Sequence, residues 1–506
     1  MKKIKYIPAI LLAASISFTS CGDILDINPV ENNTSNKFYA NEIEINQAAL
    51  GIYARLGKNS TNTDFPTEYF WLTSENRSDI LYIGGSETSA QNDQLELRKY
   101  LIGANSGTVS TIFSRLYALI KDANNLLAHT SDNEYVRYRA EACFLRAYAY
   151  FELVRSFGPV ALITAPIENK EATALPRESE ATIYAQIISD LEYAAEKLEN
   201  VYTGEAAGRV GSLAAKTLLA QVYITMAGYP LNDNSGYTKA ENTLSPVIQE
   251  ISNRFAPNYA DIFTLANENK YDLFSVQFES GRSGVGSSLP GYITNSGAGA
   301  SPFPEWTYSS YGMQGQDMRV DSLLVKEMKL SNDKRFKASI DTGYWNSLNV
   351  ETRTWIERNI ITKFLEKDNT NNKITAWNDF PRNFPILRSA DAYLIYAEAL
   401  INNGKAAQAK EYVNKIKERA GLPLLSNDPT LEDIKTERKK EFIGEGRRYF
   451  DLVRWGETEA IKVLTDFATY YHSKTNGQLP SKRDLLLPIP QNELKNRNNW
   501  DQNFGY

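Results

Sequence analysis

The stretch that decides the fold is residues 138–159, YRAEACFLRAYAYFELVRSFGP. Its apolar side chains recur at steps of three and four, which places them in two adjoining rows on an α-helix. The rows hold Ala140, Phe144, Ala147, Phe151 and Val154, and Tyr138, Ala142, Leu145, Ala149 and Leu153. Gly158 and Pro159 end the helix, because glycine adopts a left-handed cap and proline lacks an amide donor. The pattern predicts a helix inside a stack of helices, with Arg137, Glu141, Arg146, Glu152 and Arg155 on the remaining surface.

Similar periodicity predicts further helices at both ends of the chain, around an irregular middle. These helices cover 41–56, 112–127, 134–157, 180–198 (with Ser179 as its cap), 213–227 and 237–251. Residues 388–421 are predicted to form a helix–turn–helix unit with Asn403-Gly404 at the turn and Gly421 at its end. Ala397, Gly404 and Ala409 fall where a tetratricopeptide unit places small residues. We therefore expect a mostly α fold on a tetratricopeptide-like helical-repeat scaffold.

The N-terminus has the pattern of a lipoprotein signal peptide. Three lysines precede an apolar core at residues 7–18, which is too short to span a bilayer that needs about 20 residues. Thr19-Ser20-Cys21-Gly22 resembles a lipobox, in which the cysteine is acylated and becomes the mature N-terminus. We expect residues 1–20 to be removed and Cys21 to carry the lipid anchor.

The composition excludes several classes of function. A formal net charge of −6 argues against nucleic-acid binding, which needs a basic face. The two histidines, His129 and His472, have no His or Cys partner at metal-binding spacing, and Cys143 is a small core residue of its helix. The chain contains no G-x-S-x-G elbow and no phosphate loop. No metal, cofactor or catalytic residue is predicted.

Two long loops carry the candidate ligand-binding residues. The first spans residues 65–94 and the second spans residues 281–318, and loops of this length are uncommon unless they are functional. Aromatic rings offer flat faces to sugars, and polar side chains bind hydroxyl groups. The predicted ligand-binding residues are Tyr69, Trp71, Arg77, Asp79, Tyr82, Tyr292, Trp306, Tyr308 and Tyr311. Trp345, Trp355 and Trp377 lie outside these loops and are weaker candidates.

A dense run of charges at residues 437–454 resembles an active site. At helical spacing Glu441, Glu445 and Arg448 share one face. Ion pairs on helices are common and are usually structural. We interpret the run as an ion-pair network that holds the last repeat against the body.

Four stretches of the chain together resemble one family. They are residues 139–160 around Arg139-Ala140-Glu141-Ala142, residues 208–223, residues 437–456 and the end of the chain from Leu487 to Tyr506. These segments are similar, in order, to motifs of the SusD/RagB family of nutrient-binding lipoproteins. Asn496-Arg497-Asn498 departs from the Asn-Pro-Asn that the family usually has there. Residues 275–385 match least well.

The resemblance implies a fold, a location and a partner. It implies a SusD-like domain over residues 21–506, with helical hairpins at about 41–251 and 386–456 and a loop-rich ligand region at about 275–385 together with loop 65–94. It also implies a lipid-anchored outer-membrane protein facing the cell exterior, which binds oligo- or polysaccharide and delivers it to a SusC-like TonB-dependent transporter.

Three other functions remain open from the sequence. A RagB-like protein would bind peptides with the same transporter partner. A surface hydrolase would need a pair of carboxylates with perturbed pKa values in the loop cleft. The residues do not exclude it, but the resemblance to the SusD/RagB family implies that the protein is not an enzyme. A scaffold of helical repeats would bind only protein and would have no cleft for a small molecule.

Overall fold

The computed structural model describes residues 38–57, 73–83, 92–281, 284–293, 318–345, 351–352, 354–365, 374, 378–472 and 477–506. Within these segments, no helix combines the length and the apolar character needed to cross a membrane. The described chain is mostly helical, which confirms the predicted fold class.

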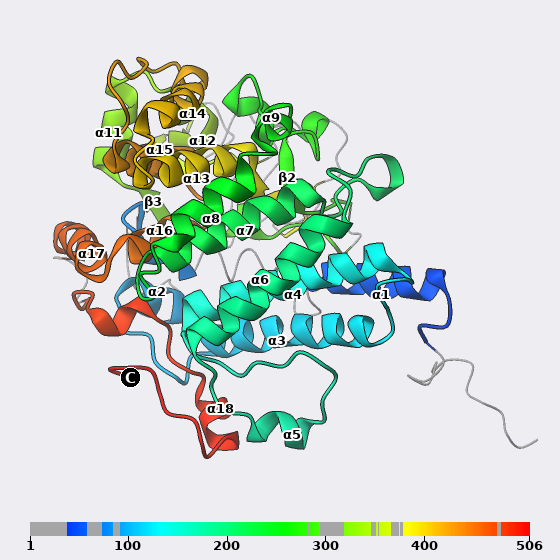
Figure 1. Cartoon of the computed structure of the whole chain (residues 1–506). Coiled ribbons are helices and arrows are strands. Elements are labelled where there is room, and N and C mark those ends of the chain that lie inside the picture. The colour runs from blue at the N-terminus through cyan, green and yellow to red at the C-terminus, as the bar shows by residue number, and fades with distance from the viewer. Residues whose placement is uncertain are drawn as a thin grey trace, which may run out of the picture.

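The body is a stack of antiparallel helices (Figure 1). The stack is formed by α1 (Glu42–Ala54), α3 (Gly107–Ala128), α4 (Val136–Phe157), α6 (Glu180–Lys197), α7 (Ser212–Ala227), α8 (Ser235–Leu244), α13 (Ser389–Asn402) and α14 (Ala406–Ala420). From α3 onward each of these helices packs on the next one named, so α8 packs on α13 across a long gap in sequence. One continuous apolar core runs through the stack.

Smaller elements surround this stack. The short helices are α2 (Asn92–Arg98), α5 (Asn169–Ala174), α9 (Ile248–Ser252), α10 (Leu289–Ile293), α11 (Ser322–Leu330), α12 (Lys334–Ser339), α15 (Leu431–Glu441), α16 (Arg448–Trp455) and α18 (Gln491–Asn496). A longer helix, α17 (Glu457–His472), follows α16 directly. Single 3-10 turns are η2 (Glu75–Arg77), η4 (Gly204–Ala206), η5 (Tyr259–Phe263), η6 (Leu265–Asn267) and η8 (Lys482–Leu485).

The helix that decides the fold is buried on more faces than its sequence predicts. Both apolar rows of α4 are buried, and Gly158 ends the helix at φ 67° with its amide bonded to the Val154 carbonyl. The charged residues were expected on the surface, but Glu141, Arg146 and Glu152 are buried. Neighbouring helices cover them and supply partners, so the Arg146 guanidinium donates to both oxygens of Asp190 at 2.8 and 2.7 Å.

The predicted helix boundaries are confirmed where local signals set them. Ser179 accepts a hydrogen bond from the Thr182 amide and caps α6, as expected. In the unit at 388–421, Gly404 and Gly421 adopt φ 75° and 73°, and Ala397 and Ala409 are fully buried where α13 packs on α14. The predicted helix at 237–251 is wrong as one element, because the chain breaks between α8 and α9 around Pro246, which lacks an amide donor.

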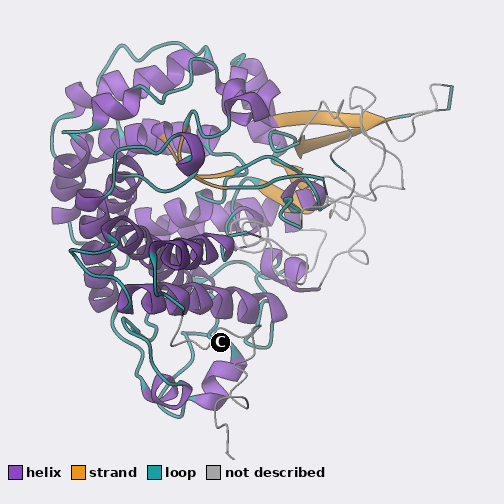
Figure 2. Cartoon of the chain, turned by 90° about the vertical axis from the view of Figure 1, so that its right-hand side faces the viewer, coloured by secondary structure: helices purple, strands orange, loops and turns teal. Residues whose placement is uncertain are grey.

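The described part of the chain also contains three small antiparallel sheets, each of two strands, which were not predicted from the sequence. They pair β1 (Leu81–Ile83) with β3 (Met318–Val320), β2 (Asp272–Val276) with β6 (Phe384–Arg388), and β4 (Ile340–Trp345) with β5 (Trp355–Ile361). β1, β3, β4 and β5 lie together, because β3 also contacts β5, and Figure 2 shows strands projecting from the side of the molecule away from most of the helices. β2 and β6 lie among the helices instead. We call the side that carries β1, β3, β4 and β5 the loop-bearing face.

A buried ionic junction joins these parts. It consists of five cations and five carboxylates, namely Arg335, Lys363, Arg388, Arg419, Arg447, Asp333, Asp391, Glu437, Glu441 and Glu445. Arg388 donates to both oxygens of Glu445 at 2.9 and 2.8 Å and to Glu441 at 2.9 Å, and Lys363 donates to Glu445 at 2.7 Å. Burial opposes ionisation of Glu445, but Arg388 and Lys363 outweigh it and lower its pKa to about 2.

The structural interpretation of the charged run is confirmed, although its geometry differs from one helix face. The chain leaves α15 at Glu441, turns through Gly444 and Gly446 at φ 77° and 73°, and begins α16 at Arg448. Only glycine adopts such angles without strain. The turn aims Glu445 at Arg388 and directs Arg448 toward Asp79.

Replacing Glu445 with Gln tests the junction. The neutral side chain would leave Arg388 and Lys363 without a shared counter-charge, and breaking a buried pair in this way costs about 3–5 kcal/mol of unfolding free energy. The contribution of Glu445 is present above its ordinary pKa and is lost as the pH falls toward about 2, because folding lowers this pKa. Denaturant unfolding should therefore show a larger difference between wild type and variant at about pH 7 than at about pH 3.

Asp466→Asn is the matched control, because Asp466 pairs with Lys462 on the surface and the two side chains are 66% and 73% exposed. It should leave the free energy of unfolding unchanged within error. Equal losses in the two variants would contradict a structural role for the junction.

Candidate functional site

β1 and β3 of the loop-bearing face belong to, or directly follow, the two segments that were predicted to bind the ligand. β1 pairs with β3 in the register Leu81–Val320, Tyr82–Arg319 and Ile83–Met318, and β3 lies beside β5. Residues 58–72, 84–91 and 294–317 adjoin these elements and are not among the described residues, so five predicted contacts lie outside the described chain. They are Tyr69, Trp71, Trp306, Tyr308 and Tyr311. Tyr292 lies in α10 with its side chain not described, and Cys21 also lies outside the described residues.

Arg77 and Asp79 are not presented to a ligand, which corrects the expectation for these two residues. Asp79 is 5% exposed and accepts hydrogen bonds from Arg448 at 2.7 and 3.0 Å and from Lys439 at 2.8 Å. Arg77 is 2% exposed, donates to the Tyr449 hydroxyl at 2.7 Å and to the Asp484 carbonyl, and lies over the Tyr449 ring. Both charges are therefore engaged inside the protein.

The whole polar run 73–79 acts as an internal anchor for β1. All seven of its residues are buried. The Arg98 guanidinium donates to the carbonyls of Asn76 and Ser78, and the Tyr100 hydroxyl donates to the carbonyl of Arg77 at 2.9 Å. Backbone groups that cannot reach water need such partners. The run therefore fixes the position of β1.

Glu75 is a buried carboxyl in this anchor. Its Oε1 accepts a hydrogen bond from the Gly446 amide at 2.9 Å, and its Oε2 has no partner in the described part of the chain. Burial raises the pKa of Glu75 to about 7, although the Gly446 amide and Lys363 oppose the shift. The folded protein therefore favours the neutral carboxyl.

Tyr82 is the one predicted contact whose described side chain reaches the edge of the loop-bearing face. Its ring stacks on Tyr471 with centroids 4.0 Å apart and planes 18° apart. Tyr471 also contacts Tyr470 and Phe467 with centroids 4.7 Å away, and its hydroxyl donates to Asp321 at 2.6 Å. Tyr470 is 60% exposed. We call Tyr82, Phe467, Tyr470 and Tyr471 the aromatic cluster.

Sequence patterns alone did not indicate that α17 belongs to the site. The local signal was the pair Tyr470-Tyr471 near the end of a helix with periodic apolar residues. The contact of Tyr471 with Tyr82 depends on tertiary packing between residues almost 400 positions apart. Trp355, a weaker candidate, is 42% exposed on β5, and its ring lies close over Gly343, where no side chain competes for the space. Trp355 and Tyr470 are therefore both partly exposed to solvent.

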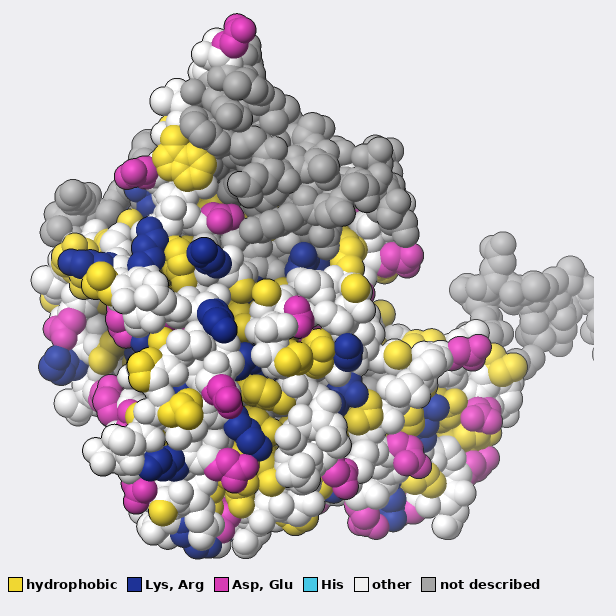
Figure 3. Space-filling view, turned by 90° about the horizontal axis from the view of Figure 1, so that it is seen from above, with side chains coloured by type: hydrophobic (Ala, Val, Ile, Leu, Met, Phe, Trp, Pro, Cys, Tyr) yellow, Lys and Arg dark blue, Asp and Glu magenta, His cyan; other side chains and the backbone are white. Residues whose placement is uncertain are grey.

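No metal or cofactor site is evident in the described residues. No group of three His, Cys, Asp or Glu side chains there could hold a metal ion. The ring of His129 stacks on Tyr39 with centroids 4.2 Å apart, and the side chain of His472 is not described. In the view of Figure 3, basic and acidic side chains alternate over the described surface rather than gathering by sign.

Glu75→Gln tests the neutral carboxyl through the pH dependence of stability. The folded state holds the Glu75 proton up to about pH 7, whereas the unfolded chain releases it near 4.5. The stabilising contribution is thus full below 4.5 and lost as the pH rises through about 7. As the pH rises from about 5 to 8, the free energy of unfolding of the wild type should fall by about 1–3 kcal/mol relative to that of Glu75→Gln, as measured by denaturant unfolding. Parallel curves for the two proteins would refute a neutral Glu75, and Glu196→Gln, at a 70% exposed carboxylate, is the control.

Comparison with known proteins identifies the family. The family model described as "SusD family" matches residues 279–506, and the one described as "Starch-binding associating with outer membrane" matches residues 25–224. SusD-like protein P2 of Formosa agariphila is 28% identical, and the starch-binding protein SusD of Bacteroides thetaiotaomicron is 25% identical, each with full coverage of both chains. The structure of surface glycan-binding protein A from Bacteroides fluxus is 26% identical with a TM-score of 0.76, covering 92% of this chain and 100% of that one. The resemblance found in the sequence is confirmed, and the chain belongs to the SusD family.

Proposed function

We propose that the protein is a non-catalytic, lipid-anchored glycan-binding protein of the outer membrane, which delivers oligo- or polysaccharide to a SusC-like TonB-dependent transporter. The observation that carries the glycan site is the aromatic cluster, which places the exposed ring of Tyr470 beside the stacked Tyr82 and Tyr471 on the loop-bearing face. Sugar rings present C–H faces that pack on such side chains, and binding sites combine these platforms with a few polar groups. Relatives in the same family are named a starch-binding protein and a surface glycan-binding protein, and these names favour the same ligand class.

The absence of catalysis in this proposal rests on where the carboxylates lie. A glycosidase needs two carboxyl groups that face the scissile bond in a cleft. The carboxylates of the charged run, Glu437, Glu441, Glu445 and Asp451, are buried in ion pairs. Glu75 has the raised pKa of a general acid, but it is fully buried and held by the Gly446 amide, so a glycan cannot reach it.

Tyr470→Ala tests the glycan site. The side chain is 60% exposed, so its removal should leave thermal stability unchanged, while the loss of a central aromatic contact should weaken glycan binding by about 1–3 kcal/mol. Calorimetry with a panel of oligosaccharides, and a parallel panel of peptides, measures both ligand classes. Leu330→Ala, which removes a 74% exposed apolar side chain from α11, is the control and should bind like wild type.

Two outcomes of that experiment would count against the proposal. Binding of peptides with no binding of any glycan would replace it with the RagB-like alternative. Unchanged glycan affinity in Tyr470→Ala and in Tyr82→Ala would show that the aromatic cluster is not part of the site.

A lipid anchor at Cys21 favours a partner in the same membrane. A chain acylated at Cys21 reaches the described body at Phe38 over at most about 60 Å, at 3.3–3.6 Å per extended residue. Such a tether keeps the body beside the membrane and raises its effective concentration toward a partner in the same membrane. A β-barrel transporter there would supply the route inward that a binding protein lacks.

Cys21→Ala and a pull-down test this part. The substitution should release the protein from the outer-membrane fraction, because the anchor is lost. Mild-detergent purification of the wild type should recover a TonB-dependent barrel in near-equal amount, through an interface beyond about 2,000 Å² as in permanent complexes. Recovery of the wild-type protein alone, with normal nutrient uptake in its absence, would contradict delivery to a transporter.

A further inference from the structure

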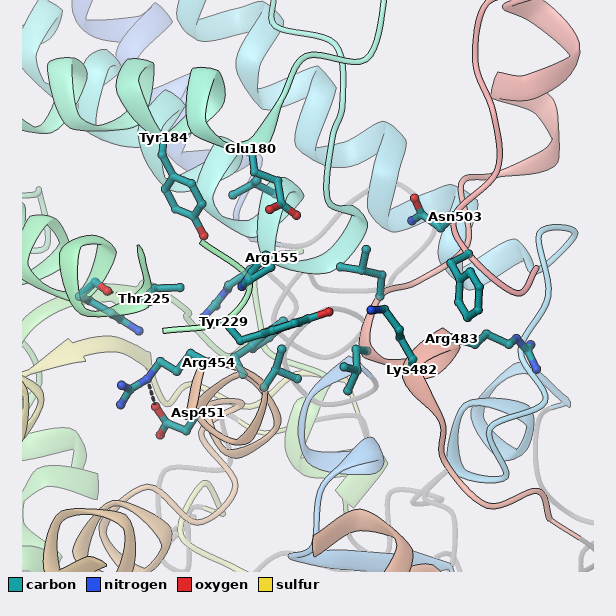
Figure 4. A pocket seen from close by; sticks show the side chains of 18 residues that line it. Arg155, Glu180, Tyr184, Thr225, Tyr229, Asp451, Arg454, Lys482, Arg483 and Asn503 are labelled. Carbon is teal, nitrogen blue, oxygen red and sulfur yellow. Dashed lines mark hydrogen bonds and ion pairs between the residues drawn. The ribbon is translucent and has the colours of Figure 1, made fainter. Parts of the chain in front are cut away.

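A cavity of about 170 Å³ lies among helix ends, apart from the strands of the loop-bearing face (Figure 4). It is bounded by the last turn of α4, the first turn of α6, the end of α7, by α16 and by the C-terminal segment from Lys482 to Phe504. Its apolar lining comes from Val154, Pro230, Phe450, Val453, Leu485 and Leu486. A cavity of about 150 Å³ can hold one benzene ring, so this one has room for a single six-membered ring.

One wall of the cavity carries polar groups with no protein partner. In Figure 4, Tyr184 and Glu180 reach from α6 into the same space. In the described part of the chain, the Glu180 carboxylate makes no hydrogen bond or ion pair, and neither the Tyr184 hydroxyl nor the Gln221 carboxamide makes a hydrogen bond. Burial raises the pKa of Glu180, and Arg177 opposes the shift. Partly buried groups of this kind are costly unless something bonds to them.

On the opposite wall, the charged side chains already have ion-pair partners that hold them in place. Glu457 pairs with Lys482, whose Nζ lies 3.1 Å from a Glu457 carboxylate oxygen. The Arg155 guanidinium pairs with both oxygens of Glu152 at 2.6 and 2.8 Å and lies 3.9 Å from the centroid of Phe450. Arg483 points away from the cavity in Figure 4.

These contacts decide the chemistry of the occupant. Of the cations that line the cavity, Arg155, Lys482 and Arg454 are paired with carboxylates, and Arg483 points away from it. An anion would therefore find no open charge among them. A cation bound to Glu180 would lie near the positive side chains of Arg155 and Lys482. What stays open is one carboxylate, one hydroxyl and one carboxamide opposite apolar and aromatic side chains. That set bonds hydroxyl groups on one side of a ring and packs on its C–H face on the other.

We propose that this cavity binds a single neutral sugar ring, as a monosaccharide or as the end of a longer glycan. Glu180 and Tyr184 accept and donate hydrogen bonds to its hydroxyl groups, Gln221 adds a third contact, and Tyr229 and Phe450 pack against the ring. The site is separate from the aromatic cluster, and sugar binding in the cavity does not require glycan binding at the loop-bearing face.

The test is saturation-transfer NMR and calorimetry on the mature protein, purified in a detergent without a sugar headgroup. The probes are glucose, galactose, mannose, xylose, fucose and N-acetylglucosamine. At least one should bind with a millimolar Kd, and Glu180→Gln and Tyr184→Phe should each weaken it about five-fold or more, as the loss of one hydrogen bond predicts. Because neither the Glu180 carboxylate nor the Tyr184 hydroxyl makes a hydrogen bond within the described chain, and Tyr184→Phe keeps the ring, both variants should stay close to the wild-type melting temperature.

The control lies on the same helix. Glu196→Gln alters a 70% exposed carboxylate near the other end of α6 and should bind the sugar like wild type. The proposal is overturned if no sugar in the panel binds, or if Glu180→Gln and Tyr184→Phe fold and bind it unchanged. Loss of monosaccharide binding in Tyr470→Ala rather than in Glu180→Gln would also overturn it, while leaving the function proposed for the loop-bearing face intact.

Discussion

The pairing of Arg388 with Glu441 and Glu445 is the interaction on which the rest of the structure depends. Arg388 stands where β6 passes into α13, so its guanidinium ties the last helical hairpin to the turn between α15 and α16. Lys363, just past β5, shares Glu445 and brings the strands of the loop-bearing face to the same point. Buried pairs add little stability over apolar packing, but a missing partner is costly. The junction therefore fixes which elements meet more than it strengthens their contact.

This constraint separates the scaffold from the ligand-binding surface. Because charges of the C-terminal run are neutralised inside, they are not offered to a ligand, and Arg448 is directed to Asp79 beneath β1. β1 then carries Tyr82 to its stack with Tyr471 on α17. Binding residues on loops need a rigid base, and here buried ion pairs and a stack of helices supply it. The cavity lined by Glu180, Tyr184 and Gln221 differs from this scaffold, because these polar side chains make no hydrogen bond within the described chain.

The parts of the fold that local signals determine could be predicted from the sequence. The apolar rows of α4, the Ser179 cap and the glycines of the α13–α14 hairpin depend on neighbours a few residues away. Pairings over long separations could not be predicted. β1 and β3 lie more than 200 residues apart, and Asp79 meets Arg448 at a separation of 369 residues. A polar run such as 73–79 therefore resembles an exposed loop until its distant partners are known.

Hydrogen exchange with and without a bound oligosaccharide tests the central claim most directly, because it reports ligand contact and scaffold rigidity in one measurement. If the ligand binds at the aromatic cluster, the amides of β1, β3 and the C-terminal end of α17 should exchange more slowly when the oligosaccharide is present. Exchange in residues 437–454 should be slow and should not change with the ligand, since their side chains are committed to the ionic junction and its neighbouring pairs. Protection by the ligand within 437–454, with none near Tyr82 and Tyr470, would contradict the central claim.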